Sequence, residues 1–497
     1  MRDLLRLDAA SRPAMWLVIG RAVGLGTAFV VPLVLVRLFD QTAFGTYKQL
    51  FLIYTTLYGL AQLGVAESLY YFVPRRPSEA GRHVANAAIT LAVVGVACIA
   101  LLGLAAGRIA EWFSNPHLGD TLVLLGIFLA LMLATAPFEI VMVSRTRYKT
   151  AAITYAASDI LRGALMLLLA MVIGGLQGVL WGAIAFAAMR LIAMLWLLRR
   201  DFGPDLRPTA ILWRHQWIYT LPFALAVGME VVQANVHQYV VAARFDPATF
   251  AIYAVGCLQI PLVDVIATSS ANVMMVKMGE ADFDKRGAAA LALWHNTMSR
   301  LALVIVPLAV FLVVMAKDII VVLFTSSYLA SVPIFRLWTL TIVFAIPCVD
   351  AVLRANAQTR FLLGLNVLRL AVVIGLISWF LTHYGLAGAV LVTLLSTALV
   401  RIIGLARIAR LFGLGFATVL PWKELARTAL YATLAAIPAY WVAEITPLPR
   451  LLVLLCAAAV YAVTYFALCF GIAFRISPFA FRTSRVANAE LRTANSE

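Results

Sequence analysis

Polar side chains recur at helical spacing within apolar stretches of this chain. Asp264, Thr268 and Asn272 follow one another at every fourth position. Because residues four apart share one face of a helix, these three predict a polar stripe. Two further stripes comprise Glu230, Gln233 and His237, and Lys48, Thr55, Tyr58 and Gln62.

The stripes favour a wet central cavity over a dry helix bundle. Hydrogen bonds between helices would account for the amides and hydroxyls, but poorly for two acids and a histidine. An ionisable group at membrane depth costs several kcal/mol unless it is paired or faces water. We therefore assign an ion-coupling or cavity role to Glu230, Gln233, His237, Asp264, Thr268 and Asn272.

Glu230, Asp264 and His237 are the candidates for ion coupling. Each is a group that can load a proton and release it as access alternates between the two sides. Oxygen ligands also suit Na⁺, so the sequence leaves H⁺ and Na⁺ open.

Composition places these stripes in a membrane. The chain has 497 residues, of which 63% are hydrophobic and 12% charged, and a mean hydropathy of +0.96. A soluble domain is about half apolar and about a quarter charged, so a soluble protein is excluded. No run of alternating strands appears, so we expect an all-α integral membrane protein.

Apolar runs of about 20 residues, the length that crosses a bilayer, recur from end to end. The first run is long and lacks a cleavage site, so it predicts a span and not a signal peptide. Fourteen transmembrane helices are predicted, near residues 14–36, 45–73, 84–107, 118–143, 150–174, 176–198, 213–242, 250–276, 291–315, 332–353, 361–382, 385–409, 424–443 and 449–474.

The net charge of +16 is a topology signal. Lys and Arg gather in alternate loops and at both termini, which predicts that both termini are cytoplasmic. The same distribution argues against a nucleic-acid surface. The five cysteines lie in apolar runs without metal-ligand spacing, so no metal, disulfide or cofactor is expected.

Enzyme motifs are missing from the sequence. It has no phosphate-binding Gly-rich loop ending in Lys-Ser/Thr, no HExxH and no GxSxG. We therefore expect a protein that is not an enzyme and is driven by an ion gradient, the membrane potential or substrate consumption.

The chain contains an internal repeat. Residues 39–47 read FDQTAFGTY, and residues 245–253, 206 positions later, read FDPATFAIY. The turn GLQG at 175–178 returns as GLAG at 385–388. Six spans per repeat, an even number, predict two parallel pseudo-symmetric halves. The expected division is an N-terminal six-helix half at 1–205, a C-terminal six-helix half at 206–413, helices 13–14 at 414–475 and a cytoplasmic tail at 476–497.

Several charged residues of the repeat are expected to have structural roles. Arg162 returns as Arg369, and Arg190 as Arg401. Duplication points to a shared structural task such as fixing helix ends. Glu139 and Asp159 flank a basic loop and are expected to pair with Arg162 or its neighbours. The Asp and Tyr of the two repeated loops are expected to cap and fix helices.

The two repeated loops, the following AQLGVAESLYYFVPR, the GLxG turn and the 6 + 6 + 2 span count resemble one known family. It is the polysaccharide transporter branch of the multidrug/oligosaccharidyl-lipid/polysaccharide (MOP) flippase superfamily, the Wzx-like O-antigen and exopolysaccharide flippases, related to the lipid II flippase. The resemblance covers nearly the whole chain.

The resemblance implies a bacterial inner-membrane flippase for polyprenyl-diphosphate-linked oligosaccharide. It further implies a central cationic cavity lined by spans one, two, seven and eight, and a groove for the lipid tail on spans thirteen and fourteen. This chain departs from the lipid II flippase, because it has fewer cavity arginines and carries Asp264 in span eight. The departure favours a substrate other than lipid II.

The diphosphate–sugar headgroup is expected to contact Arg21, Lys48, Gln62 and Arg300, since guanidinium and ammonium groups suit phosphate oxygens. Snorkelling of Arg21 and an interfacial position for Lys48 are the alternatives. Glu67 is expected to close an inner gate against an arginine, with a structural ion pair as the alternative.

The expected mechanism is alternating access between the two halves. Its partners would be the lipid-linked oligosaccharide, H⁺ or Na⁺, membrane lipids, and a polysaccharide polymerase and chain-length regulator, with no nucleic acid. A proton- or sodium-coupled multidrug exporter is the first alternative. Twelve spans are expected for such an exporter, so the predicted spans thirteen and fourteen speak against it. A membrane glycosyltransferase or polymerase is the second, and it would need a large periplasmic loop.

Overall fold

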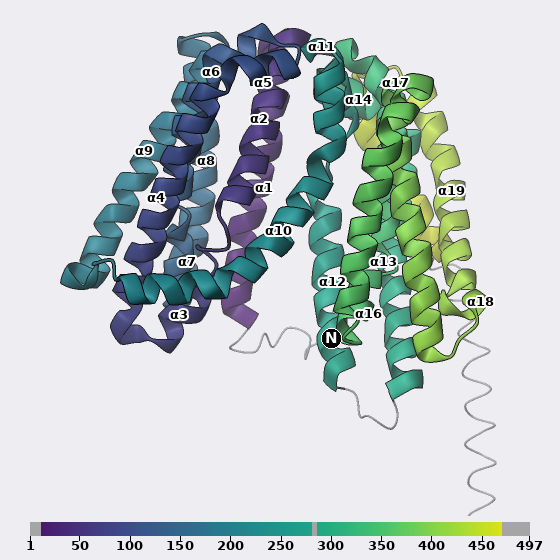
Figure 1. Ribbon diagram of the computed structural model, residues 1–497. Coiled ribbons are helices and arrows are strands. Elements are labelled where there is room, and N and C mark those ends of the chain that lie inside the picture. The colour runs from purple at the N-terminus through teal and green to yellow at the C-terminus, as the bar shows by residue number, and fades with distance from the viewer. Residues whose placement is uncertain (1–10, 281–285, 470–497) are drawn as a thin grey trace, which may run out of the picture. The chain divides into compact units, whose positions relative to one another are not determined.

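The computed structural model describes residues 11–280 and 286–469, which are helical apart from turns and short 3₁₀ segments (Figure 1). The described residues contain no β-strand, so the predicted all-α membrane fold is confirmed. Contacts divide the chain into a first unit, Met1–Val255, and a second unit, Gly256–Glu497. The predicted boundary near residue 205 rests on the repeat and not on contacts, and it stays a prediction.

The first unit is built around long antiparallel helices. Figure 1 shows α4, α6, α8 and α9 side by side, and α10 packs on α2 and α4. The helices of this unit are α1 Ser11–Leu38, α2 Gln41–Ala61, α3 Leu69–Arg75, α4 Ala80–Leu104, α5 Ala106–Trp112, α6 Pro116–Ala134, α7 Pro137–Ser144, α8 Tyr148–Val172, α9 Gly175–Phe202, α10 Ala210–Arg244 and α11 Pro247–Gly256.

The second unit has its own apolar core, in which Trp294, Met298 and Val352 are buried among α12, α13, α16 and α17. Its helices are α12 Pro261–Glu280, α13 Arg286–Val314, α14 Ala316–Phe324, α15 Val332–Thr339, α16 Val349–Ala355, α17 Thr359–Phe412, α18 Phe416–Val419, α19 Trp422–Ile445 and a final helix Arg450–Cys469.

Within the described residues, each of the fourteen predicted spans falls mainly on helical backbone. Residues 470–474 of the last span lie outside the described residues. Within the described residues, nine helices are long and apolar enough to cross a membrane, or up to eleven if each bent pair is one span. One of these helices is α17, whose 54 residues hold two predicted spans joined at Gly385. The count of fourteen is consistent with this.

Backbone conformation confirms the repeat. Residues with a positive φ occur in equivalent pairs in the two units: Ser114 and Thr325, Thr146 and Ala357, Gly175 and Gly385, Gly203 and Gly413. Left-handed φ is costly for residues other than glycine, so a duplicated left-handed Thr146 and Ala357 indicates a duplicated turn.

Close helix packing explains why both copies of the GLxG turn end in glycine. A Cβ built at Gly178 would overlap the Leu169 carbonyl oxygen, and one at Gly388 would overlap the Phe380 carbonyl oxygen. Small residues of this kind let membrane helices approach closely. Each glycine therefore holds a helix pair together at the same place in its unit.

An arginine–carboxylate pair is also duplicated. Arg190 on α9 donates to Glu139 on α7 over 2.6 Å, and Arg401 on α17 pairs with Asp350 on α16 over 2.8 Å. In each pair the acid precedes the arginine by the same number of residues. The prediction that Glu139 pairs with Arg162 or its neighbours is therefore wrong, because the bend between α6 and α7 turns Glu139 toward α9. Asp159 does pair with Arg162, over 2.7 Å.

The two repeated loops act as helix caps, as predicted. Asp40 accepts a hydrogen bond of 2.7 Å from the Ala43 backbone N–H at the start of α2. Asp246 accepts bonds from the Thr249 hydroxyl and backbone N–H at 2.6 and 3.0 Å. These bonds hold the pKa of Asp246 below its usual range, so the cap is complete at neutral pH and is lost in strong acid.

Several predicted spans are not continuous helices, among them spans two and eight. Span two breaks after Ala61, where Leu63 and Gly64 have φ values of 50° and 65°, and resumes at Leu69. Span eight breaks between Gly256 and Pro261. Apolar periodicity runs through both breaks, so it did not signal them.

The first prediction concerns the duplicated ion pair. Arg190→Gln leaves the buried Glu139, whose side chain is 3% exposed, without its cation, and the loss costs about 3–5 kcal/mol. Arg401→Gln costs less, because the Asp350 side chain is 44% exposed. Thermal unfolding of the purified variants in detergent measures both effects. Equal and small losses would contradict the structural role of the buried pair.

The second prediction concerns the contact between the repeated loops. A Cβ at Gly45 would overlap the carbonyl oxygen of Pro247, whereas a Cβ at Gly375, within α17, meets nothing within 4 Å. Gly45→Ala should therefore lower the unfolding temperature, while Gly375→Ala should leave it unchanged or raise it, since alanine favours helix by up to about 1 kcal/mol. The reverse order would show that the two loops do not pack closely.

Candidate functional site

The polar stripe of α12 is exposed along its whole length. Asp264, Thr268 and Asn272 all have exposed side chains on this helix. Ser269, Ser270 and Lys277 of the same helix line a pocket of about 380 Å³ between α12 and α13. The predicted stripe thus lies beside a polar pocket in the second unit.

The α12–α13 pocket is cationic. Its lining contains Lys277 and Arg300 and, among the described residues, no acid. The Arg300 Nε donates to the Asn296 Oδ1 over 3.0 Å, which orients the guanidinium. The full lining is Ser269, Ser270, Val273, Met274, Lys277, Leu293, Asn296, Thr297 and Arg300. Two cations with hydroxyl and amide donors around them are suited to bind a phosphate group.

Sequence reasoning identified Arg300 in this pocket but missed Lys277 as a site residue. In the sequence, Lys277 follows the eighth predicted span and is one of the Lys and Arg residues that indicate topology. The spacing could have identified Lys277 as a site residue, because Ser269, Val273 and Lys277 lie at four-residue intervals and so share one face of α12. Asn296 and Arg300 have the same spacing on α13.

A second pocket lies beside Asn272. It has a volume of about 350 Å³ and is lined by Asn272, Val273, Val276 and Lys277. It shares Val273 and Lys277 with the α12–α13 pocket. Asp264 lies thirteen residues before Lys277, or about 20 Å along the helix, so the acid and the cations of α12 are far apart.

The stripe on α10 changes from exposed to buried along the helix. Glu230 is exposed, Gln233 is half-buried and His237 is buried. The Nδ1 of His237 lies 2.7 Å from the Tyr253 hydroxyl of α11. His237 therefore fixes α10 to α11, and Tyr253 has the fixing role that the repeat predicted.

The predicted headgroup residues of the first unit are separated. Lys48 lies near the start of α2, half-buried, with its Nζ 5.5 Å from the centre of the Phe44 ring. Gln62 caps the opposite end of the same helix. Gln62 still lies one helical turn after Tyr58, as the predicted stripe requires, because its backbone N–H donates to the Tyr58 carbonyl oxygen over 3.3 Å. The side chain of Arg21 lies outside the described residues.

Glu67 lies in the break between α2 and α3. Its Oε2 is buried and has no hydrogen-bond partner among the described residues. No arginine of the described residues forms an ion pair with it. A buried carboxyl oxygen left unbonded is costly, so the gate role of Glu67 stays a prediction for another conformation.

An aromatic and basic pocket follows this break. It has a volume of about 360 Å³ between α3 and α10. The Arg75 guanidinium lies 4.0 Å from the centre of the Tyr71 ring, which stacks on Tyr219 at 4.7 Å. The lining is Tyr71, Phe72, Arg75, Arg76, His215, Ile218 and Tyr219. It lies where the sequence predicts the cytoplasmic end of the span.

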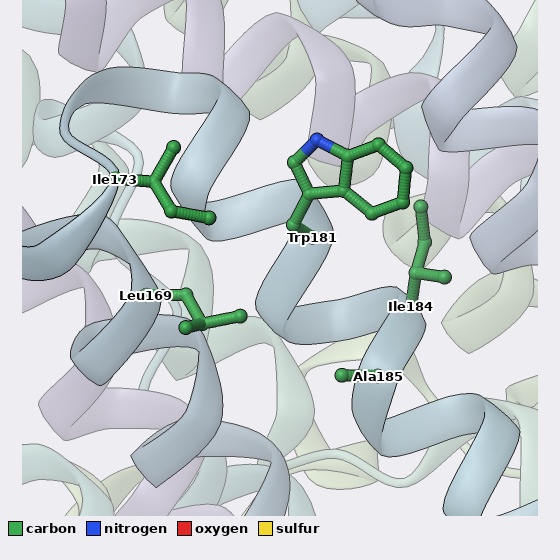
Figure 2. A pocket seen from close by; sticks show the side chains of 5 residues that line it. All are labelled: Leu169, Ile173, Trp181, Ile184 and Ala185. Carbon is green, nitrogen blue, oxygen red and sulfur yellow. The ribbon is translucent and has the colours of Figure 1, made fainter.

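A larger pocket between α8 and α9 is apolar. It has a volume of about 570 Å³, and Figure 2 shows its lining of Leu169, Ile173, Trp181, Ile184 and Ala185. The Trp181 indole nitrogen is the one polar side-chain atom in that view. Such a pocket is suited to a hydrocarbon chain and cannot hold a charged headgroup.

No group of three or more His, Cys, Asp or Glu residues that could hold a metal ion occurs in the described residues. The cysteines of this part of the chain are unpaired. The sequence expectation of no cofactor is neither supported nor opposed by this observation.

Comparison with known proteins identifies the fold. The lipid II flippase MurJ in an inward closed conformation superposes with a TM-score of 0.69 at 14% identity, covering 91% of this chain and 99% of that one. An outward-facing multidrug resistance MATE family transporter of the MOP superfamily gives 0.54 at 13% identity, covering 81% and 95%. The eukaryotic MATE transporter AtDTX14 gives 0.53 at 14% identity, covering 84% and 99%.

Comparison with curated protein sequences finds no match. The family model described as polysaccharide biosynthesis protein matches residues 34–333, more than half of the chain. With a MurJ-like fold and membrane-spanning helices already established, this match places the chain in the polysaccharide biosynthesis protein family, as a multi-pass membrane protein of the MOP flippase superfamily.

Proposed function

We propose that this protein translocates a polyprenyl-diphosphate-linked oligosaccharide, an O-antigen or exopolysaccharide repeat unit, across the bacterial inner membrane by alternating access. The α12–α13 pocket is the observation that carries the proposal. Lys277 and Arg300 supply two positive charges for a diphosphate, and Asn296 and Ser269 supply neutral polar groups for a sugar. The family description and the likeness to a lipid II flippase support a lipid-linked substrate.

In the proposed cycle the headgroup enters from the cytoplasm, where both termini lie. Lys277 and Arg300 neutralise the diphosphate, and this removes the main electrostatic cost of moving the headgroup into the protein. The prenyl chain stays in lipid beside helices 13–14. The halves 1–205 and 206–413 then move against each other and expose the headgroup to the periplasm.

Glu230 and Asp264 are proposed as the ion-coupling groups. Both side chains are exposed, and no ion pair involving either occurs among the described residues. A carboxylate open to water at membrane depth can exchange a proton or Na⁺ as access changes. His237 is a weaker member of this set, since its ring nitrogen is bonded to Tyr253.

A multidrug exporter is the second candidate, and the exposed Asp264 is the observation that favours it. A lone carboxylate attracts organic cations, and the fold is shared with MATE transporters. The cationic α12–α13 pocket opposes this candidate, because it would repel such a substrate.

The third prediction tests the diphosphate contacts. Removal of both charges by Lys277→Gln and Arg300→Gln should reduce polysaccharide export at least about tenfold, because hydrogen bonds to charged groups contribute about 1.5–3 kcal/mol each. Export is measured as surface polysaccharide in cells that depend on this protein. The matched control is Arg360→Gln, an exposed arginine outside the pocket. Full export by the double variant, at equal membrane levels, would remove the pocket from the mechanism.

The fourth prediction separates ion coupling from drug export. Glu230→Gln and Asp264→Asn should change the dependence of headgroup transport on H⁺ or Na⁺ in vesicles. Neither the original protein nor the variants should protect cells from cationic dyes. Dye efflux that disappears in Asp264→Asn would favour the multidrug exporter. Transport with an unchanged ion dependence would exclude both acids as coupling groups.

A further inference from the structure

The two units have equivalent arginines but different acids. In the first unit, Asp159 lies three residues before Arg162 on α8 and pairs with it over 2.7 Å. In the second unit, Arg369 of α17 occupies the equivalent position, and three residues before it stands Asn366. At these equivalent positions the first unit therefore carries a carboxylate and the second unit a neutral amide.

The replacement leaves the second unit with an excess positive charge. Arg401 pairs with Asp350, as its counterpart in the first unit pairs with its own acid. Arg369 interacts electrostatically with both Arg401 and Asp350. Two guanidinium groups thus share one carboxylate, which is itself 44% exposed, whereas in the first unit two guanidinium groups have two carboxylates.

The hydrogen bonding of this cluster is also incomplete. The Nε atoms of Arg369 and Arg401 are buried, and neither has a hydrogen-bond partner among the described residues. Arg369 lies about two turns inside predicted span eleven. A guanidinium at that depth requires an anion or water, and its planar donors match the oxygens of a phosphate or a carboxylate.

We propose that Arg369 and Arg401 form an oxyanion-binding site within the second unit, which receives an acidic group of the transported headgroup. The acidic group is a phosphate of the diphosphate or a carboxylate of an acidic sugar. Only the source of the anion rests on the proposed function. The site itself follows from the exchange of an acid for Asn366 and from the two unbonded Nε atoms.

The repeat supplies the matched variants. Asn366→Asp places a carboxylate one turn before Arg369, as Asp159 stands before Arg162. This carboxylate should pair with Arg369 and so weaken the binding of an added anion. Arg369→Gln removes the cation. Arg162→Gln alters the equivalent arginine of the first unit, where an acid already compensates the charge, and is the control.

The test measures anion binding to the purified full chain through the rise of its thermal unfolding midpoint. The probes are inorganic pyrophosphate and glucuronate, in a buffer of low chloride. A chain carrying Lys277→Gln and Arg300→Gln is titrated in parallel, so that the α12–α13 pocket does not contribute to the pyrophosphate result.

We expect at least one probe to raise the midpoint, with an apparent affinity that falls at least about tenfold in Asn366→Asp and in Arg369→Gln but not in Arg162→Gln. A response to pyrophosphate alone assigns the site to the diphosphate, and a response to glucuronate assigns it to an acidic sugar. No response to either probe, or an equal response in Asn366→Asp, overturns the inference.

Failure of this inference is distinguishable from failure of the proposed function. Polysaccharide export that is lost with Lys277 and Arg300, in a protein that shows no anion response at Arg369, leaves the flippase proposal standing and removes this site. The Asn366→Asp chain also guards against misfolding, because it should unfold at a midpoint equal to or above that of the unsubstituted chain.

Discussion

A guanidinium inside a bilayer must be compensated, and this constraint organises both units. Arg190 and Arg401 each reach a carboxylate that lies just after a break within an earlier span. The break is what points the acid sideways, toward α9 in one unit and toward the second part of α17 in the other. Loss of either partner leaves a charge that membrane helices cannot easily solvate. The bent spans and the ion pairs therefore depend on each other.

Symmetry in this protein is a property of the scaffold, and its candidate functional groups lie where the symmetry fails. The paired left-handed turns and the close-packing Gly178 and Gly388 recur in both units. The break at Leu63 and Gly64 has no counterpart of positive φ in the second unit's described residues. The α12–α13 pocket and Asn366 also belong to one unit only. A transporter that binds one asymmetric substrate needs such differences between its halves.

The sequence was sufficient for the features that depend on composition and repetition. Hydropathy located the helices, and the repeat predicted that Arg190 and Arg401 have structural roles. It did not show that Glu139 turns toward Arg190, because that depends on a bend between helices. It likewise missed the break after Ala61, since apolar residues continue through it and only Gly64 marks it. Lys277 was overlooked because an interfacial lysine and a pocket lysine have the same appearance in sequence.

In the proposed mechanism, α12 would serve both a cation and an anion, and the arrangement of charge along the helix is compatible with this. Asp264 and Lys277 lie about 20 Å apart along its axis. At that distance, with an effective dielectric constant of about 20, their mutual attraction is less than about 1 kcal/mol. Neither group is therefore neutralised by the other. An acid near one end remains open to H⁺ or Na⁺, while the base near the other end, together with Arg300, remains open to phosphate. If both ligands bind as proposed, coupling between them would pass through movement of the helix, not through direct charge contact.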